Sequence, residues 1–383
     1  MLARAVAVAA LAGIFASCED VLAAYGGEQQ QKQPVELSVS LRTPEAAKEK
    51  GSGWVSVCAE GAWTLGFEDP APDWAKLSVG EGTGKKSNIT LSWTANDGLE
   101  VRRCTLVVSE GEKQAKAVFA QKGLTLESDP VPAWMELPAT DDESLYFFTL
   151  PMEIDGKQYR NYSFYWDVKA LVAHWVAYPL NSTLLKGSSG RSDAWGGMFP
   201  RLDAKYQPRL NSAYSGGKWA RGHQLPSADR QILQYNKETF YGVNMTPQDY
   251  NFNSGAWLNC ETFVRDASRK VDTLYVVTGC VVSPSYGTTT DNDGKTVTCP
   301  SAYFKALLAY KKNLSYGRST GGYTGIAFHF PNGGFSGAYT TAAITIDKLE
   351  EITGMDFFVN LPGAIGQTRA DEVESTVESW WFE

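Results

Sequence analysis

Short strand-like runs dominate the first third of the chain. Four of them, residues 53–58, 89–95, 103–108 and 115–121, are rich in β-branched residues or alternate apolar with polar residues, and Gly, Asn and Asp stand between them. Successive side chains of a strand point to opposite faces, so this alternation indicates strands with one buried face. Short strands at this spacing predict an all-β, immunoglobulin-like sandwich over residues 35–123.

The pattern changes after residue 123. Residues 124–140 contain Pro130, Pro132 and Pro138 and are predicted to form a linker. Beyond them, residues 162–165, 173–178, 273–282 and 325–330 resemble strands, whereas residues 253–269, 301–310 and 346–353 resemble helices. The strands and helices do not alternate regularly, which favours an α+β domain with a mixed sheet over residues 141–383 rather than a doubly wound sheet.

The N-terminus resembles an export signal. After Arg4, residues 5–16 form an apolar run that is short for crossing a bilayer, and small residues lead to Cys18. We interpret residues 1–17 as a signal peptide, Cys18 as the lipid-bearing first residue of the mature protein, and the Gln-rich residues 18–34 as a tether. The expected location is the cell envelope, with a lipid anchor in the outer membrane or at the cell surface. Ordinary secretion after a later cleavage is the alternative.

Export would allow disulfides among the five remaining cysteines. Cys280 and Cys299 each end a strand-like run, and two neighbouring strands would bring them together, so we predict this pair. Cys58 and Cys104 are a second candidate pair, within the N-terminal domain. No CxxC or His–Cys spacing indicates a zinc site.

The charge balance at first argues against a nucleic-acid partner. The 383 residues are enough for about two domains, and 43% of them are hydrophobic. The formal net charge of the whole chain is −8, whereas phosphate binding favours a positive charge. The charge is uneven, however: residues 186–270 hold 12 Lys and Arg against 7 Asp and Glu, whereas the five charged residues after Arg369 are all acidic. Phosphate binding depends on local positive charge, so the whole-chain value does not exclude a nucleic-acid substrate.

One of the three histidines lies in a sequence that suggests chemistry. His174 and His329 stand inside apolar strand-like runs and are interpreted as structural. His223 follows Arg221 and Gly222. An imidazole accepts protons near neutral pH, and an arginine two residues earlier points the same way on a strand, where it can bind a phosphate.

A second group of polar residues follows. Residues 244–248 read Asn-Met-Thr-Pro-Gln. Asn253, Trp257, Glu261 and Arg265 then follow at intervals of four residues. This spacing predicts one stripe on a helix. Amide and carboxylate oxygens suit Mg²⁺, which keeps most of its waters. The structural alternative is that Asn253 caps the helix and that Glu261 and Arg265 form a surface ion pair.

Taken together, the Arg-Gly-His motif, the Asn-x-x-Pro-Gln motif and the Asn-x-Gly-x-Trp-x-x-x-Glu-x-x-x-Arg stripe resemble the DNA/RNA non-specific endonuclease family, which has a ββα-metal active site. Thr278-Gly279, residues 300–305 and residues 349–358 match further segments of that family in the same order. The resemblance implies hydrolysis of DNA and RNA with Mg²⁺, or alternatively Mn²⁺, little sequence preference and products with a 5′-phosphate. Related enzymes are often dimers, so a homodimer is a further expectation.

The resemblance also implies roles for individual residues. His223 matches the general base, Asn253 the direct Mg²⁺ ligand, and Glu261 the carboxylate that holds metal-bound waters. The remaining matches are residues that bind phosphate, support the site or hold the substrate or helix: Arg191, Arg221, Asn244, Gln248 and Arg265. The family usually has Asp before Arg-Gly-His, where this chain has Ala220, which puts fine positioning or rate in question more than activity.

The N-terminal domain resembles BACON-type immunoglobulin-like domains. The matching residues are Trp63, Trp74, Asn96, Arg103 and the closing Gln121-Lys122-Gly123. This resemblance implies a spacer or a module that binds carbohydrate or mucin. The tryptophans Trp54, Trp63, Trp74 and Trp93 are expected to pack in the core or at an edge rather than to form a sugar platform. The alternative function is therefore a non-enzymatic surface lipoprotein that binds glycan or mucin through this domain.

Overall fold

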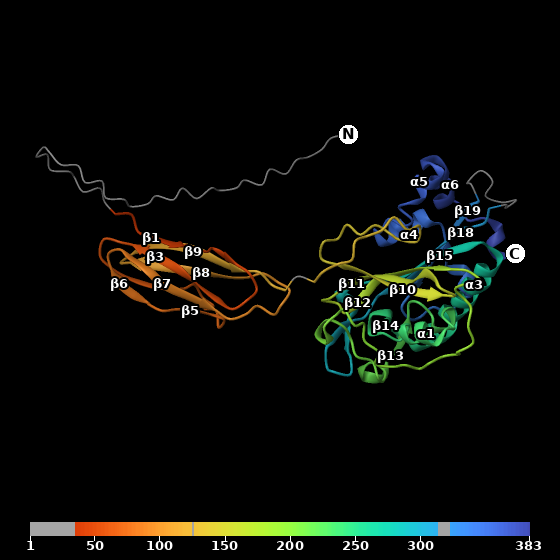
Figure 1. Ribbon diagram of the computed structural model, residues 1–383, viewed down its shortest axis with the longest axis horizontal. Helices are drawn as coiled ribbons and strands as arrows, with labels where there is room; N and C mark the ends of the chain where they lie inside the picture. The colour runs from red at the N-terminus through yellow and green to blue at the C-terminus, as the bar shows by residue number, and fades with distance from the viewer. Residues whose placement is uncertain (1–34, 125, 313–321) are drawn as a thin grey trace, which may run out of the picture. The chain divides into compact units, whose positions relative to one another are not determined.

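The computed structural model describes residues 35–124, 126–312 and 322–383, so the predicted signal peptide, Cys18 and the tether lie outside the described residues. Contacts within the chain divide it into two compact units between residues 125 and 126 (Figure 1). In the part of the chain that the structure describes, no helix combines the length and apolar character needed to cross a membrane.

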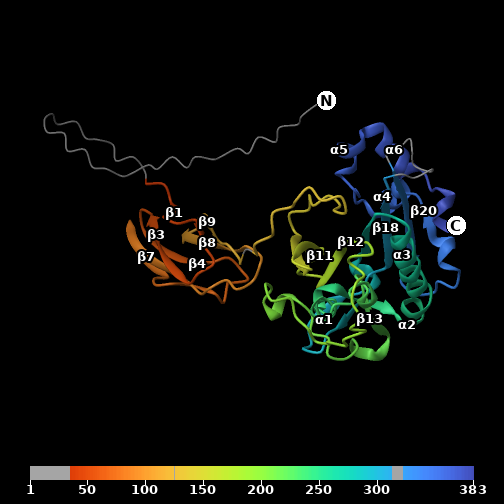
Figure 2. The same cartoon turned by 45° about the vertical axis from the view of Figure 1, so that its right-hand side comes forward.

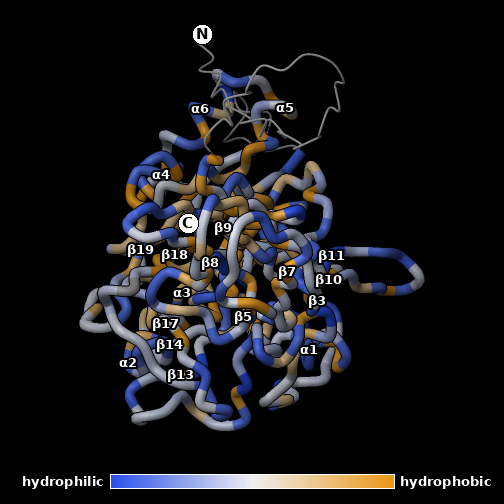
Figure 3. Tube along the Cα trace, turned by 90° about the vertical axis from the view of Figure 1, so that its left-hand side faces the viewer, coloured by the Kyte–Doolittle hydropathy of each residue, from blue (hydrophilic) through white to orange (hydrophobic). Residues whose placement is uncertain are grey.

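The first unit consists of two β-sheets around one apolar core. The strands of the four-stranded sheet are, in spatial order, β1 (Ser38–Leu41), β3 (Gly51–Cys58), β7 (Lys86–Trp93) and β5 (Ala75–Leu77). Those of the five-stranded sheet are β2 (Glu45–Ala46), β9 (Lys113–Gln121), β8 (Arg102–Glu110), β4 (Ala62–Phe67) and β6 (Glu81–Thr83). Along β7, the buried Ile89 and Leu91 stand on either side of the polar Thr90. Figure 3 shows hydrophobic and hydrophilic stretches interleaved along the chain. The core therefore forms from the alternating apolar positions of both sheets.

The four tryptophans of this unit differ in exposure. Trp63 and Trp93 are buried, and their indole nitrogens donate hydrogen bonds to the carbonyls of Gly84 and Glu49. Trp74 is half-buried, with the guanidinium of Arg102 4.3 Å from its ring centre. Trp54 is 44% exposed and points away from the core, unlike the other three.

Both predicted disulfides are wrong, because every described cysteine is a free thiol. Cys58 follows the inward-facing Val57 on β3 and so points outward, whereas Cys104 points into the core from β8. Cys280 lies on a central strand of the second unit and donates a hydrogen bond to the carbonyl of Ala173. Cys299 instead follows a separate two-stranded hairpin, formed by β16 (Thr288–Thr290) and β17 (Thr296–Thr298).

The second unit is built on a seven-stranded sheet in which every neighbouring pair is antiparallel, so the predicted mixed sheet is wrong although the α+β class fits. Its strands are, in spatial order, β10 (Tyr146–Ile154), β11 (Lys157–Asp167), β12 (Val172–Leu180), β15 (Thr273–Val281), β18 (Ala302–Tyr310), β19 (Tyr323–Pro331) and β20 (Ala343–Ile344). The predicted linker is part of this unit from residue 126 onward. Leu137 lies in its core, and the buried Glu136 pairs with Arg160, so these residues do not form a free connection.

Different elements cover the two faces of this sheet. Helices α4 (Ile346–Thr353), α5 (Leu361–Ile365) and α6 (Gln367–Ser375) pack with Phe304 and Leu308 of β18 in one core. On the other face, Tyr303 of β18 contacts Trp257, which lies just before the long helix α3 (Leu258–Lys270). Figure 2 shows α3 running along the sheet and α4 to α6 gathered at one end. The short helix α1 (Leu233–Glu238) precedes the segment that carries α3.

One predicted helix, over residues 301–310, is instead the strand β18. Its residues from Ala302 to Ala309 are all buried, because helices or the α3 segment cover both faces of the sheet here. A strand buried on both faces reads as a continuous apolar run without alternation, and periodicity alone does not separate such a run from a buried helix. By contrast, the helix predicted over residues 346–353 corresponds to α4.

Candidate active site

A β-hairpin followed by a helix forms the centre of the site. Strand β13 (Trp219–His223) pairs antiparallel with β14 (Met245–Asp249), so that His223 lies opposite Met245 and Gly222 opposite Thr246. The chain then passes through α2 (Tyr250–Phe252) and a π-helical turn, η5 (Asn253–Trp257), into α3. Because side chains alternate along a strand, Arg221 and His223 point to the same side of the hairpin.

The helix begins earlier than predicted, which changes the interpretation of Asn253. The side chain of Asp249 accepts hydrogen bonds from the backbone N–H groups of Asn251 and Phe252, at 2.9 and 3.0 Å, and so caps the helix. Asn253 is already inside the helical segment and is not its cap. Its side chain makes no hydrogen bond with another described residue, so the amide is available to a ligand.

A pocket of about 260 Å³ opens between the hairpin and the helix. Six residues that the sequence singled out line it: Arg191, Arg221, His223, Asn253, Glu261 and Arg265. Pro226, Ser227, Ala228, Ser254 and Leu258 complete the lining. Three of the four residues in the stripe predicted on the helix therefore line the pocket. The fourth, Trp257, has its ring buried against Tyr303 and Phe330.

His223 is only 8% exposed and is held by aromatic rings. Its imidazole packs edge-on against Phe240, with ring centres 4.9 Å apart, and against Trp195 at 5.7 Å. Among the described residues, its Nε2 atom has no hydrogen-bond partner. Burial, followed by the positive charges of Arg191 and Arg221, lowers the pKa of His223 to about 3. The imidazole is therefore neutral at physiological pH and has a nitrogen free to accept a proton.

Each of the three arginines is anchored by a different partner. Arg221 donates from Nη1 to the carbonyls of Leu210 and Asn211, at 3.1 and 2.9 Å. The Nε of Arg191 donates to Asp193 at 2.8 Å. These bonds leave several guanidinium donors of both residues free for an anion.

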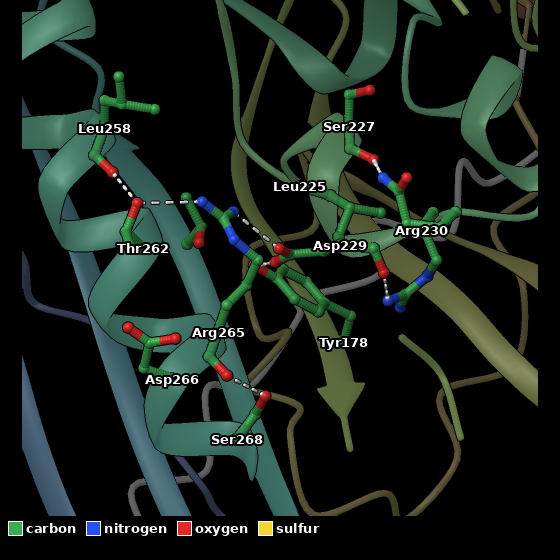
Figure 4. Close-up of polar contacts among 12 residues, drawn as sticks. Tyr178, Leu225, Ser227, Asp229, Arg230, Leu258, Thr262, Arg265, Asp266 and Ser268 are labelled. Atoms are coloured by element: carbon green, nitrogen blue, oxygen red, sulfur yellow. Dashed lines mark hydrogen bonds and ion pairs between the residues drawn. The ribbon is translucent and has the colours of Figure 1, made fainter. Parts of the chain in front are cut away.

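Arg265 is held by the buried carboxylate of Asp229. Its Nη1 donates to Asp229 Oδ1 at 3.0 Å, and its Nη2 donates to the hydroxyl of Thr262 at 3.2 Å. Figure 4 shows the guanidinium between these two partners, with Tyr178 on the far side of Asp229. The alternative prediction of a surface ion pair between Glu261 and Arg265 is therefore wrong, because Arg265 pairs with Asp229 instead.

Glu261 is a buried carboxylate without an ion-pair partner within 4 Å among the described residues. Burial raises the pKa of Glu261 to about 7, although the positive charge of Lys305 opposes this increase. Lys305 is itself fully buried on β18, where its Nζ donates to the hydroxyl of Thr278 at 2.9 Å and lies 4.2 Å from the ring centre of Trp257. A carboxylate this poorly compensated favours a bound cation.

Comparison with known proteins identifies the family. Residues 144–364 match the model of the DNA/RNA non-specific endonuclease family. This chain belongs to that family. The match begins after the first unit, whose BACON-type resemblance therefore remains a prediction.

Known relatives of this endonuclease-family chain include mitochondrial and bacterial proteins. The mitochondrial nuclease EXOG of Xenopus laevis is 28% identical over 235 residues, which cover 58% of this chain and 63% of that protein. A nuclease of Nostoc sp. is 33% identical over 213 residues, covering 54% of this chain and 73% of that protein. A solved EndoG/EndoGI complex superposes with a TM-score of 0.44 at 20% identity, over 55% of this chain and 86% of that chain. The chain spans about three fifths of the length of the EXOG relatives that it matches.

Asn253 and Glu261 are the residues of this endonuclease-family site that fit a divalent cation. Both line the pocket, one with an amide that has no other partner and one with a buried carboxylate. Within the described ranges, this site included, no group of three or more His, Cys, Asp or Glu side chains could hold a metal. An amide oxygen and one carboxylate suit Mg²⁺, because this ion binds through few protein ligands and keeps its waters.

Two predicted site residues do not line the pocket. Asn244 is buried behind it: its Oδ1 accepts from the N–H of Leu225 at 2.8 Å, and its Nδ2 donates to the carbonyls of Leu225 and Thr239. It therefore fixes the loop that follows His223. Gln248 lies on the face of the hairpin opposite His223, and neither of its amide atoms has a hydrogen-bond partner among the described residues. This position does not fit the predicted substrate contact.

Several residues that contact the pocket lining belong to no motif in the sequence. Asp229 lies in a short turn, η3 (Ser227–Asp229), and matches no motif. Trp195 and Phe240 come from loops far from β13 in the sequence and contact His223 only in the folded chain. A buried salt bridge and an aromatic contact of this kind depend on tertiary structure, so no local pattern indicates them.

We expect Gly222→Ala to reduce both stability and activity. An added Cβ would lie 2.2 Å from Oε1 and 2.3 Å from Cδ of the buried Gln248, so the hairpin would have to shift. Overpacking of this kind costs about 1–3 kcal/mol, and the shift would displace His223, the next residue. Thermal unfolding and nuclease assays measure both effects. Gly363→Ala, where the new Cβ meets nothing within 4 Å, is the control; equal melting temperatures for the two variants would contradict the prediction.

Proposed function

We propose that the second unit hydrolyses phosphodiester bonds of DNA and RNA with the help of Mg²⁺. The observation that carries this proposal is the composition of one pocket: a neutral, unpartnered histidine, three arginines, a free amide and a buried carboxylate. Nucleophile generation, phosphate binding and cation binding are the three requirements of this reaction, and each has candidate side chains here.

His223 is proposed as the general base that removes a proton from the attacking water. It is neutral because burial and the two nearby arginines disfavour the imidazolium form, so it can accept a proton. A base with so low a pKa would be weak in the free protein. A phosphodiester bound between Arg191 and Arg221 would offset their positive charge, which would raise the basicity of the imidazole in the complex.

The arginines are proposed to bind the phosphate and to stabilise the charge that develops on it. Arg191 and Arg221 have free donors, whereas Arg265 is fixed by Asp229 and presents its charge from the helix side. A bound Mg²⁺ would supply Lewis acid stabilisation of the leaving 3′-oxygen, which gives products with a 5′-phosphate. The contacts go mainly to phosphate, which carries no sequence information, so little sequence preference is expected.

A metal-dependent assay tests this proposal. The purified chain is incubated with supercoiled plasmid and with single-stranded RNA, in Mg²⁺ and in EDTA, and the product ends are tested for a 5′-phosphate by ligation. We expect both substrates to be cut in Mg²⁺ and neither in EDTA, because the buried Glu261 needs a cation to serve in catalysis. Undiminished cleavage in EDTA would contradict the metal requirement, and no cleavage with Mg²⁺ or Mn²⁺ would contradict the proposed function itself.

A further inference from the structure

The indole of Trp195 does not line the pocket but contacts three residues that do, Arg191, Arg221 and His223. The guanidinium carbon of Arg221 is 3.4 Å from its ring centre, and that of Arg191 is 5.2 Å away. The ring of His223 meets the indole at 5.7 Å with an interplanar angle of 67°. Phe240 packs edge-on against Trp195, with ring centres 4.7 Å apart, and against His223 at 4.9 Å. One side chain thus contacts both proposed phosphate-binding arginines and the proposed base.

The contacts of Trp195 hold two positively charged side chains in the same small region. Burial lowers the pKa of Arg221, and the positive charge of Arg191 lowers it further, so the two guanidinium groups repel each other. After burial, both charges also lower the pKa of His223. Arg221 donates hydrogen bonds from Nη1, to two loop carbonyls, which anchors one end of the guanidinium and leaves its other donors free. An indole face against the guanidinium supports it further, because a flat, weakly hydrated cation stacks on an aromatic ring.

The turn that carries Trp195 is itself tightly placed. Gly196 has φ +80°, and a Cβ at this position would lie 2.4 Å from the side chain of Asn211, whose carbonyl accepts from Arg221. The carbonyl of Gly197 accepts from the N–H of Gly242, at 3.0 Å. The turn therefore packs closely against the loop that carries an Arg221 acceptor, and it is hydrogen-bonded to the segment that leads into β14. Both contacts restrict movement of the indole.

We propose that Trp195 is a positioning residue for catalysis: its ring orients Arg221 toward the scissile phosphate and holds Arg191 and His223 around the same centre. This inference rests on the proposed nuclease function. It assigns a role to a residue outside the motifs around β13 and α3, and it locates that role in the aromatic face rather than in the volume of the side chain.

Two substitutions separate the aromatic face from the volume. Trp195→Phe keeps a ring, whereas Trp195→Leu keeps an apolar side chain without one. We expect Trp195→Leu to lower kcat/KM about 10-fold or more, with part of the loss in kcat, and Trp195→Phe to retain most of the activity. If Trp195→Leu does not fold, Trp195→Met fills the space with a flexible chain and answers the same question.

Trp134→Leu is the matched control. Trp134 also stacks with an arginine, since the guanidinium of Arg160 lies 4.8 Å from its ring centre, but it packs with the core on the α4–α6 face of the sheet. Its loss should reduce the melting temperature without changing kcat or KM. A variant that affects activity only through general stability would behave like this control.

The salt dependence of cleavage gives a readout that a merely structural role would not change. Each phosphate contact contributes about 0.9 to the slope of log(kcat/KM) against log salt on duplex DNA. Arg221→Ala and Trp195→Leu should therefore each reduce this slope by up to about 1, and Trp195→Leu should add little in the Arg221→Ala background. Wild-type kinetics in Trp195→Leu, or fully additive losses in the double variant, would overturn the inference. An inactive wild-type chain would instead refute the proposed function.

Discussion

Replacing His223 with alanine should reduce kcat by about 10²–10⁴-fold, the range that general base catalysis contributes. The imidazole lines the pocket as a neutral proton acceptor whose Nε2 has no partner among the described residues, and the arginines beside it cannot replace it because they stay protonated. Substrate binding should change little, since the proposed phosphate contacts come from the arginines. Single-turnover cleavage of plasmid DNA at saturating protein measures the chemical step directly.

Two further measurements make this result specific. Added imidazole should restore part of the activity of His223→Ala, because the cavity that it leaves is lined by Phe240 and Trp195, which would hold a ring. His329→Gln is the control, since His329 lies half-buried on β19 and outside the pocket. Full activity in His223→Ala would exclude the residue as the base.

Replacing Glu261 with glutamine should change stability and activity in opposite directions. Burial raises the pKa of the folded-state carboxyl to about 7 from an ordinary value of 4.5. Between these pH values the folded protein binds a proton that the unfolded chain has released, so the free energy of unfolding falls as pH rises from about 4.5 to 7. Glutamine cannot ionise. In EDTA above pH 7 the variant should therefore be more stable than the wild type, by up to about 3 kcal/mol.

The same substitution should lower Mg²⁺ affinity and activity, by about 10–100-fold, because it removes the negative charge near the proposed cation. Glu374→Gln is the matched control. Burial and then the charge of Glu350 raise the pKa of Glu374 to about 8, yet this residue lies on α6 and does not line the pocket. It should gain stability at neutral pH with unchanged activity. Denaturant unfolding from pH 4.5 to 8 measures the stabilities, and a pH-independent difference between Glu261→Gln and wild type would contradict the assignment.

The parts of this molecule that the sequence predicts are those fixed by local rules. Alternation over residues 53–58 and 115–121 corresponds to β3 and β9, and amphipathic spacing over residues 346–353 corresponds to α4. The motifs also predicted four residues that line one pocket, namely His223, Asn253, Glu261 and Arg265. The hairpin and the helix that follows it place these side chains close together.

The predictions that failed depend on what surrounds a segment. Residues 301–310 form a strand because both faces of the sheet are covered, which no feature of the run itself reveals. The cap of the helix is Asp249 rather than Asn253, since a wider turn inside the segment moves its start. Cys58 and Cys104 point in different directions from their sheets. Trp195 and Asp229 contact residues that line the pocket, through tertiary contacts that no sequence spacing indicates.

The ββα segment has a consequence for how this protein can change over evolution. Of the six predicted residues that line the pocket, five lie between Trp219 and Lys270, and Arg191 alone comes from outside this stretch. Most of the reactive groups are therefore inherited as one contiguous block, and the surrounding sheet acts as its frame. We therefore expect changes in the length of loops and edge strands far from this block to leave these five residues in place.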